Sequence, residues 1–274
     1  MRPLVLTLAL MVLACGSPDT AAEIRPDEPP APAFDGALAG EAAARIRHGR
    51  RIADVLGCTG CHGAELQGER FYELYASNLT RELPGYTDAQ LEVLLRDGVH
   101  PSGRDVWGMP SEIFQHLGEA DLTALTAYLR TLRPAGPPTQ PALPFDPETR
   151  QLIADGELMP AAQFVRQTRS TTPADLGPRH ALGRYITMVT CAECHGPELE
   201  GREGDNPDLI VAGAYTRDQF ETLMTTGVPL GGRELRLMGE VARGRFSRMT
   251  RHERDAIYDY LRARALQDRS ETAS

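Results

Sequence analysis

Four of the five cysteines in this chain stand in two runs of one pattern. The runs are Cys58-Thr59-Gly60-Cys61-His62 and Cys191-Ala192-Glu193-Cys194-His195, each of the form C-x-x-C-H. In such a run the two thiols can add to the two vinyl groups of one porphyrin, and the imidazole that follows can reach the iron. The pattern therefore predicts two covalently attached c-type haems, with the cysteines as attachment points and His62 and His195 as iron ligands.

Two other interpretations of these cysteines are weaker. A C-x-x-C pair can form a thiol–disulfide centre, but the chain lacks the βαβ pattern that surrounds such centres. Two pairs can bind zinc, yet more than a hundred residues separate these two, which does not suit a compact zinc ribbon. Neither interpretation explains a histidine directly after both pairs.

The two runs belong to an internal repeat. A segment of the form E-L-x-G follows each histidine at the same distance, at residues 65–68 and 198–201. Further matches recur in the same order after short gaps: Tyr86-Thr87 with Tyr215-Thr216, Gln90 with Gln219, Gly98-Val99 with Gly227-Val228, Gly103-Arg104 with Gly232-Arg233, Phe114 with Phe246, and Tyr128-Leu129-Arg130 with Tyr260-Leu261-Arg262. Self-similarity of this kind predicts a duplicated domain.

Each copy has the pattern of three helices. The first helix leads into the haem motif, over residues 41–56 and 179–189. The last helix carries its apolar residues on one face, namely Leu122, Leu125, Leu129 and Leu132 in the first copy and Ile257, Tyr260, Leu261 and Ala265 in the second. No strand pattern competes with these helices, so the sequence predicts an all-α fold.

The middle helix has signals at both ends. It begins at Thr87 or Thr216, each followed three residues later by Gln, which is the spacing of a capping box. It ends at Gly98 or Gly227, because glycine suits the left-handed residue that closes a helix.

The repeat sets the expected domain boundaries. Residues 41–134 form the first haem domain and residues 172–266 the second. The Pro-rich stretch from Pro134 to Pro147 predicts a linker over residues 135–171, with a short helix in its second half. Residues 267–274 are expected to form a disordered tail.

The N-terminus has the pattern of an export signal. Arg2 precedes an apolar run over residues 4–13, and a bilayer-spanning helix needs about 20 such residues. The run ends in Leu-Ala-Cys, which resembles a lipobox, so residues 1–14 are predicted as a signal peptide and Cys15 as a lipidated N-terminus. A plain secretory signal is the alternative. Residues 15–40 are rich in Pro, Ala and acidic residues and predict a disordered tether. The protein is thus expected on the periplasmic side of a bacterial membrane, lipid-anchored.

The sixth iron ligand is predicted from the repeat. Met109 is the only methionine of the first copy, and the local spacing places Met238 at the same position in the second. A single Met is usually a core filler, but two at one repeat position favour iron ligation, which leaves no open position on the metal. His48 and His180, on Arg-rich helix surfaces, are expected to be solvated instead.

Charged residues give weaker predictions. Arg104 and Arg233 share a repeat position five residues before each methionine, where a guanidinium could bind a haem propionate or stand solvated in a turn. The formal net charge of −9 makes nucleic acid an unsuitable partner and favours a basic protein partner.

With these residues in place, both copies resemble class I c-type cytochrome domains. The first copy is similar to the cytochrome subunits of membrane-bound quinoprotein alcohol and gluconate dehydrogenases, on the segments Asn78-Leu79-Thr80, Tyr86-Thr87-Asp88, Arg96-Asp97-Gly98-Val99, Met109-Pro110 and Ala127-Tyr128-Leu129-Arg130. The second copy resembles other dihaem lipoproteins found near respiratory enzymes, on Leu237-Met238-Gly239 and Arg245-Phe246-Ser247. Those dehydrogenase subunits typically carry three haem motifs, whereas this chain has two.

The resemblance has further implications for packing. It implies that Gly49 and Gly183 contact Tyr128 and Tyr260 of the last helices. Many relatives hold the haem histidine with a proline carbonyl, a role open to Pro207 in the second copy. The first copy has no proline shortly after its motif.

The function implied is single-electron transfer through two haem c groups in series, not catalysis. The donor would be a periplasmic or membrane dehydrogenase or a quinol-oxidising complex, and the acceptor an oxidase or another cytochrome. One alternative is a dihaem enzyme, such as a peroxidase or a thiosulfate-oxidising cytochrome, which needs an open iron. Another is a haem-bearing subunit of a larger respiratory complex.

Overall fold

The computed structural model describes residues 31–71, 74–202 and 206–272. The chain divides into two units, Met1–Ala31 and Pro32–Ser274, and the second contains both haem motifs. The expected signal peptide and Cys15 lie outside the described residues. In the part of the chain that is described, no helix has the length and hydropathy to cross a bilayer.

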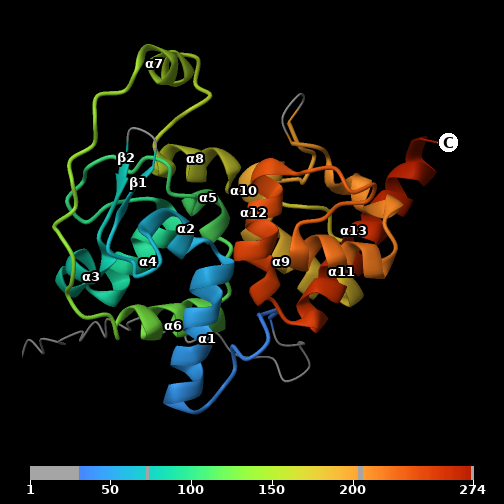
Figure 1. Ribbon diagram of the computed structural model, residues 1–274, viewed down its shortest axis with the longest axis horizontal. Coiled ribbons are helices and arrows are strands. Elements are labelled where there is room, and N and C mark those ends of the chain that lie inside the picture. Colours follow the sequence, from blue (N-terminus) through green and yellow to red (C-terminus); the bar gives the residue numbers. More distant parts are fainter. Residues whose placement is uncertain (1–30, 72–73, 203–205, 273–274) are drawn as a thin grey trace, which may run out of the picture. The chain divides into compact units, whose positions relative to one another are not determined.

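The first copy is built on a crossing of two helices. Helix α1 (Ala42–Val55) packs against α6 (Glu119–Leu129), as Figure 1 shows. Gly49 lies at the crossing, where an added Cβ would stand 1.9 Å from the carbonyl oxygen of Ala124 and 2.8 Å from Cβ of Tyr128. The expected contact between Gly49 and Tyr128 is confirmed, and the two backbones touch there.

The second copy repeats this crossing. Helix α9 (Ala181–Thr190) packs against α13 (Arg251–Thr272). A Cβ added to Gly183 would lie 2.1 Å from the carbonyl oxygen of Ala256 and 2.7 Å from Cβ of Tyr260. The contact between Gly183 and Tyr260 is likewise confirmed.

The middle helices begin and end where the sequence predicts. Helix α4 (Asp88–Asp97) and helix α11 (Arg217–Thr226) both start with a complete capping box, in which threonine and glutamine side chains each bond the other's backbone N–H. Both end at a left-handed glycine, Gly98 with φ +66° and Gly227 with φ +76°.

Short elements complete the two copies. The first copy adds α2 (Cys58–His62), α3 (Leu79–Glu82), η1 (Leu83–Gly85) and α5 (Ser111–Phe114), and the second adds η2 (Pro178–His180), α10 (Ala192–His195), η3 (Leu209–Ala214), α12 (Arg236–Gly244) and η4 (Phe246–Arg248). Strands β1 (Glu69–Phe71) and β2 (Leu74–Ala76) form one antiparallel hairpin, with Glu69 opposite Ala76. The all-α prediction is confirmed. The sequence pattern missed the hairpin because β1 is exposed throughout and has no apolar alternation.

The two copies share a continuous apolar core. Ile52 and Leu125 from the first copy and Ile186 and Ile257 from the second belong to one buried cluster. An ion pair joins the copies at its edge, where both Nη atoms of Arg51 on α1 lie 2.8 Å from the buried carboxylate of Glu253 on α13.

The predicted disorder is wrong for the last part of the tether and for most of the tail, because both are folded. Phe34 is 2% exposed and contributes to the shared core, and the backbone N–H of Asp35 donates to Glu253 Oε1 at 2.8 Å. One large apolar residue in a Pro- and Ala-rich stretch forms no periodic pattern that would predict its burial. The sequence therefore predicts disorder over too many residues. At the other end, α13 continues to Thr272, so residues 267–272 are helical.

The segment expected as a linker packs along the first copy. Asn78 donates from Nδ2 to the carbonyls of Ala135 and Pro137, at 2.8 and 2.7 Å. The segment then forms α7 (Pro147–Ala154), which has no buried residue and projects from the rest of the unit in Figure 1. Helix α8 (Ala161–Thr168) follows, packs on α4 and α5, and buries Val165 completely.

His48 is buried, which corrects the expectation that it is solvated. Its Nε2 lies 2.9 Å from Oδ1 of Asp121. The other oxygen, Oδ2, accepts from the Tyr185 hydroxyl of the second copy at 2.7 Å and from the backbone N–H of Phe34 at 3.1 Å. His48 precedes Gly49 at the helix crossing, and the close approach of α6 covers it. Asp121 thus joins both copies and the N-terminal segment.

Candidate haem sites

The imidazole of His62 is oriented for metal binding. Its Nδ1 lies 2.8 Å from the carbonyl oxygen of Ser77. Because a carbonyl only accepts, Nδ1 carries the proton and Nε2 keeps its lone pair. Burial lowers the pKa of His62, with the Ser77 carbonyl opposing that change. The neutral form that a metal needs is therefore favoured.

His195 has the same arrangement in the second copy. Its Nδ1 lies 2.8 Å from the carbonyl oxygen of Pro207, and burial lowers its pKa. Ser77 and Pro207 stand at equivalent points, each two residues before a leucine whose N–H bonds back to the haem loop. The first copy needs no proline because the contact uses a backbone carbonyl, which any residue supplies.

The attachment thiols face apolar surroundings. Cys58 is partly exposed, and desolvation raises the pKa of its thiol to about 12. Cys191 is buried, and desolvation raises the pKa of its thiol to about 11. Both sulfurs are neutral at physiological pH, and each stands at the start of a short helix, α2 or α10, that ends in the haem histidine.

A cavity of about 650 Å³ adjoins the first motif. Cys58, Cys61 and His62 line it together with Met109, which lies in the loop before α5. Most of the remaining lining is apolar and includes Leu56, Leu79, Leu83, Leu91, Leu94 and Leu95. Cofactor sites typically measure about 300–1,000 Å³ and are mainly apolar. Volume, lining and donor set all fit a haem, with the imidazole and the thioether in one cavity.

The second predicted methionine has a different setting. Met238 lies on α12, partly buried against the apolar core. The stretch from Arg233 to Phe246 is three residues longer than the matching stretch from Arg104 to Phe114, which makes room for this helix. Arg104 also lines the cavity of the first copy, and Arg233 is exposed. In the first copy, the two predicted iron ligands, His62 and Met109, line the same cavity.

Several cavity residues escaped the sequence analysis. Thr139, Gln140, Pro141 and Ala142 of the expected linker line the first cavity, as does Glu193 from inside the second haem motif. No local pattern signals these contacts, because they depend on how the linker and the second copy pack against the first.

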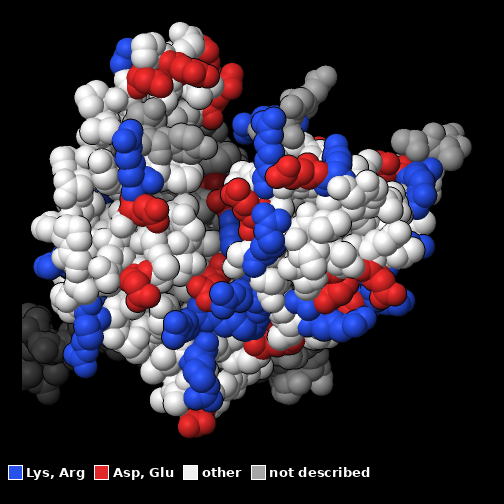
Figure 2. Space-filling view, in the orientation of Figure 1, with Lys and Arg blue, Asp and Glu red and all other residues white. Residues whose placement is uncertain are grey.

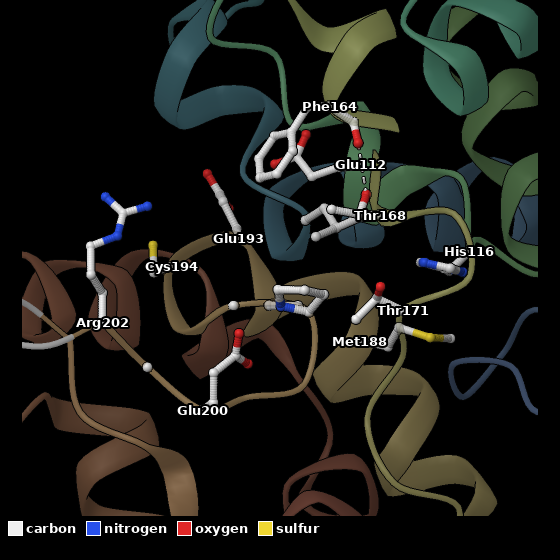
Figure 3. A pocket seen from close by; sticks show the side chains of 15 residues that line it. Glu112, His116, Phe164, Thr168, Thr171, Met188, Glu193, Cys194, Glu200 and Arg202 are labelled. Atoms are coloured by element: carbon white, nitrogen blue, oxygen red, sulfur yellow. Dashed lines mark hydrogen bonds between the residues drawn. The ribbon is translucent and has the colours of Figure 1, made fainter. Parts of the chain in front are cut away.

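A smaller cavity of about 200 Å³ lies between the copies (Figure 3). Glu112 and Phe164 line it from the first copy and the linker, and Glu193, Cys194 and Glu200 line it from the second. Burial raises the pKa of Glu112 to about 7, and the negative charge of Glu193 adds to the rise. Glu112 is therefore a carboxyl group that titrates near neutral pH.

Glu112 is expected to make the folded state less stable as pH rises. Its pKa is raised from 4.5 to about 7, so between these values the folded chain keeps a proton that the unfolded chain has lost. Stability falls across this window, by up to about 3 kcal/mol at 1.36 kcal/mol per unit. Glu112→Gln should remove this loss in unfolding titrations at pH 5 and pH 8, whereas Glu119→Gln, on an 82% exposed side chain, should not. Parallel pH dependence in wild type and Glu112→Gln would contradict the assignment.

Comparison with known proteins agrees with this geometry. A family model described as Cytochrome c matches residues 46–133 and 181–265. Each matched segment contains one C-x-x-C-H run, and together they span more than half of the chain. Among curated proteins, none matches at a significant level.

Proposed function

This chain belongs to the cytochrome c family, and we propose that it is a tandem dihaem electron carrier with both irons ligated by histidine and methionine. Two cytochrome c domains make it a haem-based electron-transfer protein with covalently attached haem c. The observation that most supports histidine–methionine ligation is that His62 and Met109 line the same cavity.

The residues of the cavity suit such a carrier. When bound, haem supplies a one-electron redox centre. His62 presents a neutral ring held by a backbone carbonyl, so its orientation does not change with the charge of the site. Met109, which lines the same cavity, would supply a thioether ligand. Such a ligand would raise the reduction potential relative to a second histidine and leave the iron no open position. The leucines that line the cavity would shield a bound haem from water.

The location and partners are part of the proposal. The N-terminal export and lipobox pattern supports a lipid-anchored protein on the periplasmic side of a bacterial membrane. Electrons would come from a dehydrogenase or a quinol-oxidising complex and leave to an oxidase or another cytochrome, with the chain standing alone or as a subunit of a larger complex.

Charge gives two hints about docking. The net charge of −9 favours a basic partner at long range. On the face shown in Figure 2, however, arginines gather over α1 and near the C-terminal end of α12, among scattered acidic groups. Association should therefore depend on local charge pairs, which salt screens over about 10 Å.

One observation favours the alternative of a dihaem enzyme. Met238 lies on a helix whereas Met109 lies in a loop, so the two methionines are not presented alike. An iron in the second copy without its thioether would have an open position, as a dihaem peroxidase or a thiosulfate-oxidising cytochrome requires.

Replacing either methionine tests the ligand assignment. Met109→Ala or Met238→Ala should convert one of the two haems from low-spin to high-spin and leave the other unchanged, because the thioether is lost from one iron. Optical spectra of the oxidised and reduced protein measure this. Met249→Leu is the control, since Met249 is buried in the core and corresponds to Leu117 of the first copy. A variant that keeps the wild-type spectrum would show that its methionine is not the ligand.

A further inference from the structure

Arg245 of the second copy reaches into the first copy beside its haem motif. It stands between α12 and η4, and its Nε donates to the carbonyl oxygen of Val55 at 3.1 Å. Val55 is the last residue of α1, three positions before Cys58. The guanidinium also lies against Gly57, where an added Cβ would stand 2.7 Å from Cζ. A side chain at the residue before the first attachment cysteine would therefore displace this guanidinium.

The same guanidinium binds the interior of the second haem motif. Its Nη1 lies 2.9 Å from Oε2 of Glu193, which stands between Cys191 and Cys194. Glu193 in turn lines the cavity that contains Cys58 and Cys61. Arg245 thus links the second haem motif, through an ion pair, to the backbone just before the first motif, through a hydrogen bond.

The charge of Arg245 is largely shielded from water. Its side chain is 15% exposed, and Nη2 is buried with no hydrogen-bond partner among the described residues. Salt screens such a charge much less than one on the surface.

We propose that Arg245, through its ion pair with Glu193, positions the two haem-attachment motifs against each other and raises the reduction potentials of the haems they hold. This inference rests on the proposed function, since it needs two bound haems. Reduction adds one negative charge to a haem site, and a nearby buried cation stabilises that state. A carboxylate at the same place acts in the opposite direction. The two partners therefore have opposite and separately measurable effects.

The experiment is an optical redox titration of the purified holoprotein and four variants. Arg245→Gln should lower at least one midpoint potential, shifting the ratio of reduced to oxidised haem about tenfold, or about 59 mV for a one-electron couple. Glu193→Gln should raise it by a similar factor. Arg245→Lys keeps the charge but lacks the guanidinium that bonds Val55 and Glu193 at once. Its midpoint potentials should therefore stay closer to those of wild type than the potentials of Arg245→Gln. Arg251→Gln removes an equal charge from a 64% exposed side chain and should change the ratio less than twofold.

The outcomes separate this inference from the proposed function. Shifts of opposite sign in Arg245→Gln and Glu193→Gln support a charge effect, because simple loosening of the interface would move both variants in one direction. Shifts of the same sign, or midpoints equal to wild type, would overturn the inference. If Arg245→Gln does not mature with its haems, the comparison of Glu193→Gln and Arg245→Lys with wild type still decides it. A wild-type protein without two titrating haems would instead refute the proposed function.

Discussion

Replacing Gly49 or Gly183 with alanine is expected to destabilise the fold by about 3 kcal/mol or more. Each added Cβ would stand about 2 Å from a backbone oxygen of the facing helix, at 1.9 Å for Gly49 and 2.1 Å for Gly183. Backbone cannot rotate away as a side chain can, so the helices must separate. Separation would open the packing around Ile52 or Ile186, both fully buried.

The control uses another helical glycine of the same chain. Gly244 ends α12, and a Cβ added there would meet nothing within 4 Å. Because alanine has the higher helix propensity, Gly244→Ala should be neutral or slightly stabilising. Denaturant unfolding of the three variants measures the difference. Equal stability of Gly49→Ala and Gly244→Ala would refute the close crossing of α1 and α6.

Replacing Asp121 with alanine is the second change with a large expected effect, about 3–5 kcal/mol of lost stability. The carboxylate is fully buried and accepts from His48, from the Tyr185 hydroxyl and from the N–H of Phe34. Its removal leaves three buried donors without an acceptor. Since these donors come from both copies and the N-terminal segment, the two copies should also unfold less cooperatively.

Two further variants apportion the Asp121 effect. Tyr185→Phe removes the hydrogen bond from the second copy to Asp121, together with the one that the same hydroxyl accepts from the N–H of Gly118, and should cost about 1–3 kcal/mol. Glu119→Ala removes an exposed acid from the same helix, paired with Arg96, and should cost at most about 1 kcal/mol. Calorimetry of the holoprotein gives both the stability and the number of transitions. An Asp121→Ala variant no less stable than Glu119→Ala would contradict the network.

The features that the sequence predicted are those set by local chemistry or by the repeat. Thr87 and Thr216 cap their helices because threonine and glutamine at that spacing bond each other's backbone over one turn. The backbone contact at Gly49 and the role of the Pro207 carbonyl could be predicted from the resemblance to class I c-type cytochromes. Both depend on a given residue type at a fixed position in that kind of domain. The cavity that joins His62 to Met109 agrees with the repeat argument for the first copy.

What escaped prediction depends on packing between distant segments. The Arg-rich sequence around His48 is typical of a helix surface, yet His48 is buried. Its partner Asp121 comes from another helix, and Tyr185, which also bonds Asp121, comes from the other copy. Phe34 and the linker lack periodicity, so no local pattern predicts that Phe34 packs in the shared core or that the linker packs along the first copy. Arg245 and Glu193 lie where the two copies meet, and only 15% and 27% of their side chains are exposed.

The most direct test of the proposed function is the optical spectrum of the exported holoprotein, recorded oxidised, reduced, and reduced under carbon monoxide. The proposal predicts two low-spin haems per chain and a reduced spectrum that carbon monoxide does not change, because a histidine and a methionine would ligate each iron and leave it no open position. A haem that readily binds carbon monoxide would show an open iron. That result would contradict an electron carrier whose irons have no open position, and would favour a dihaem enzyme instead.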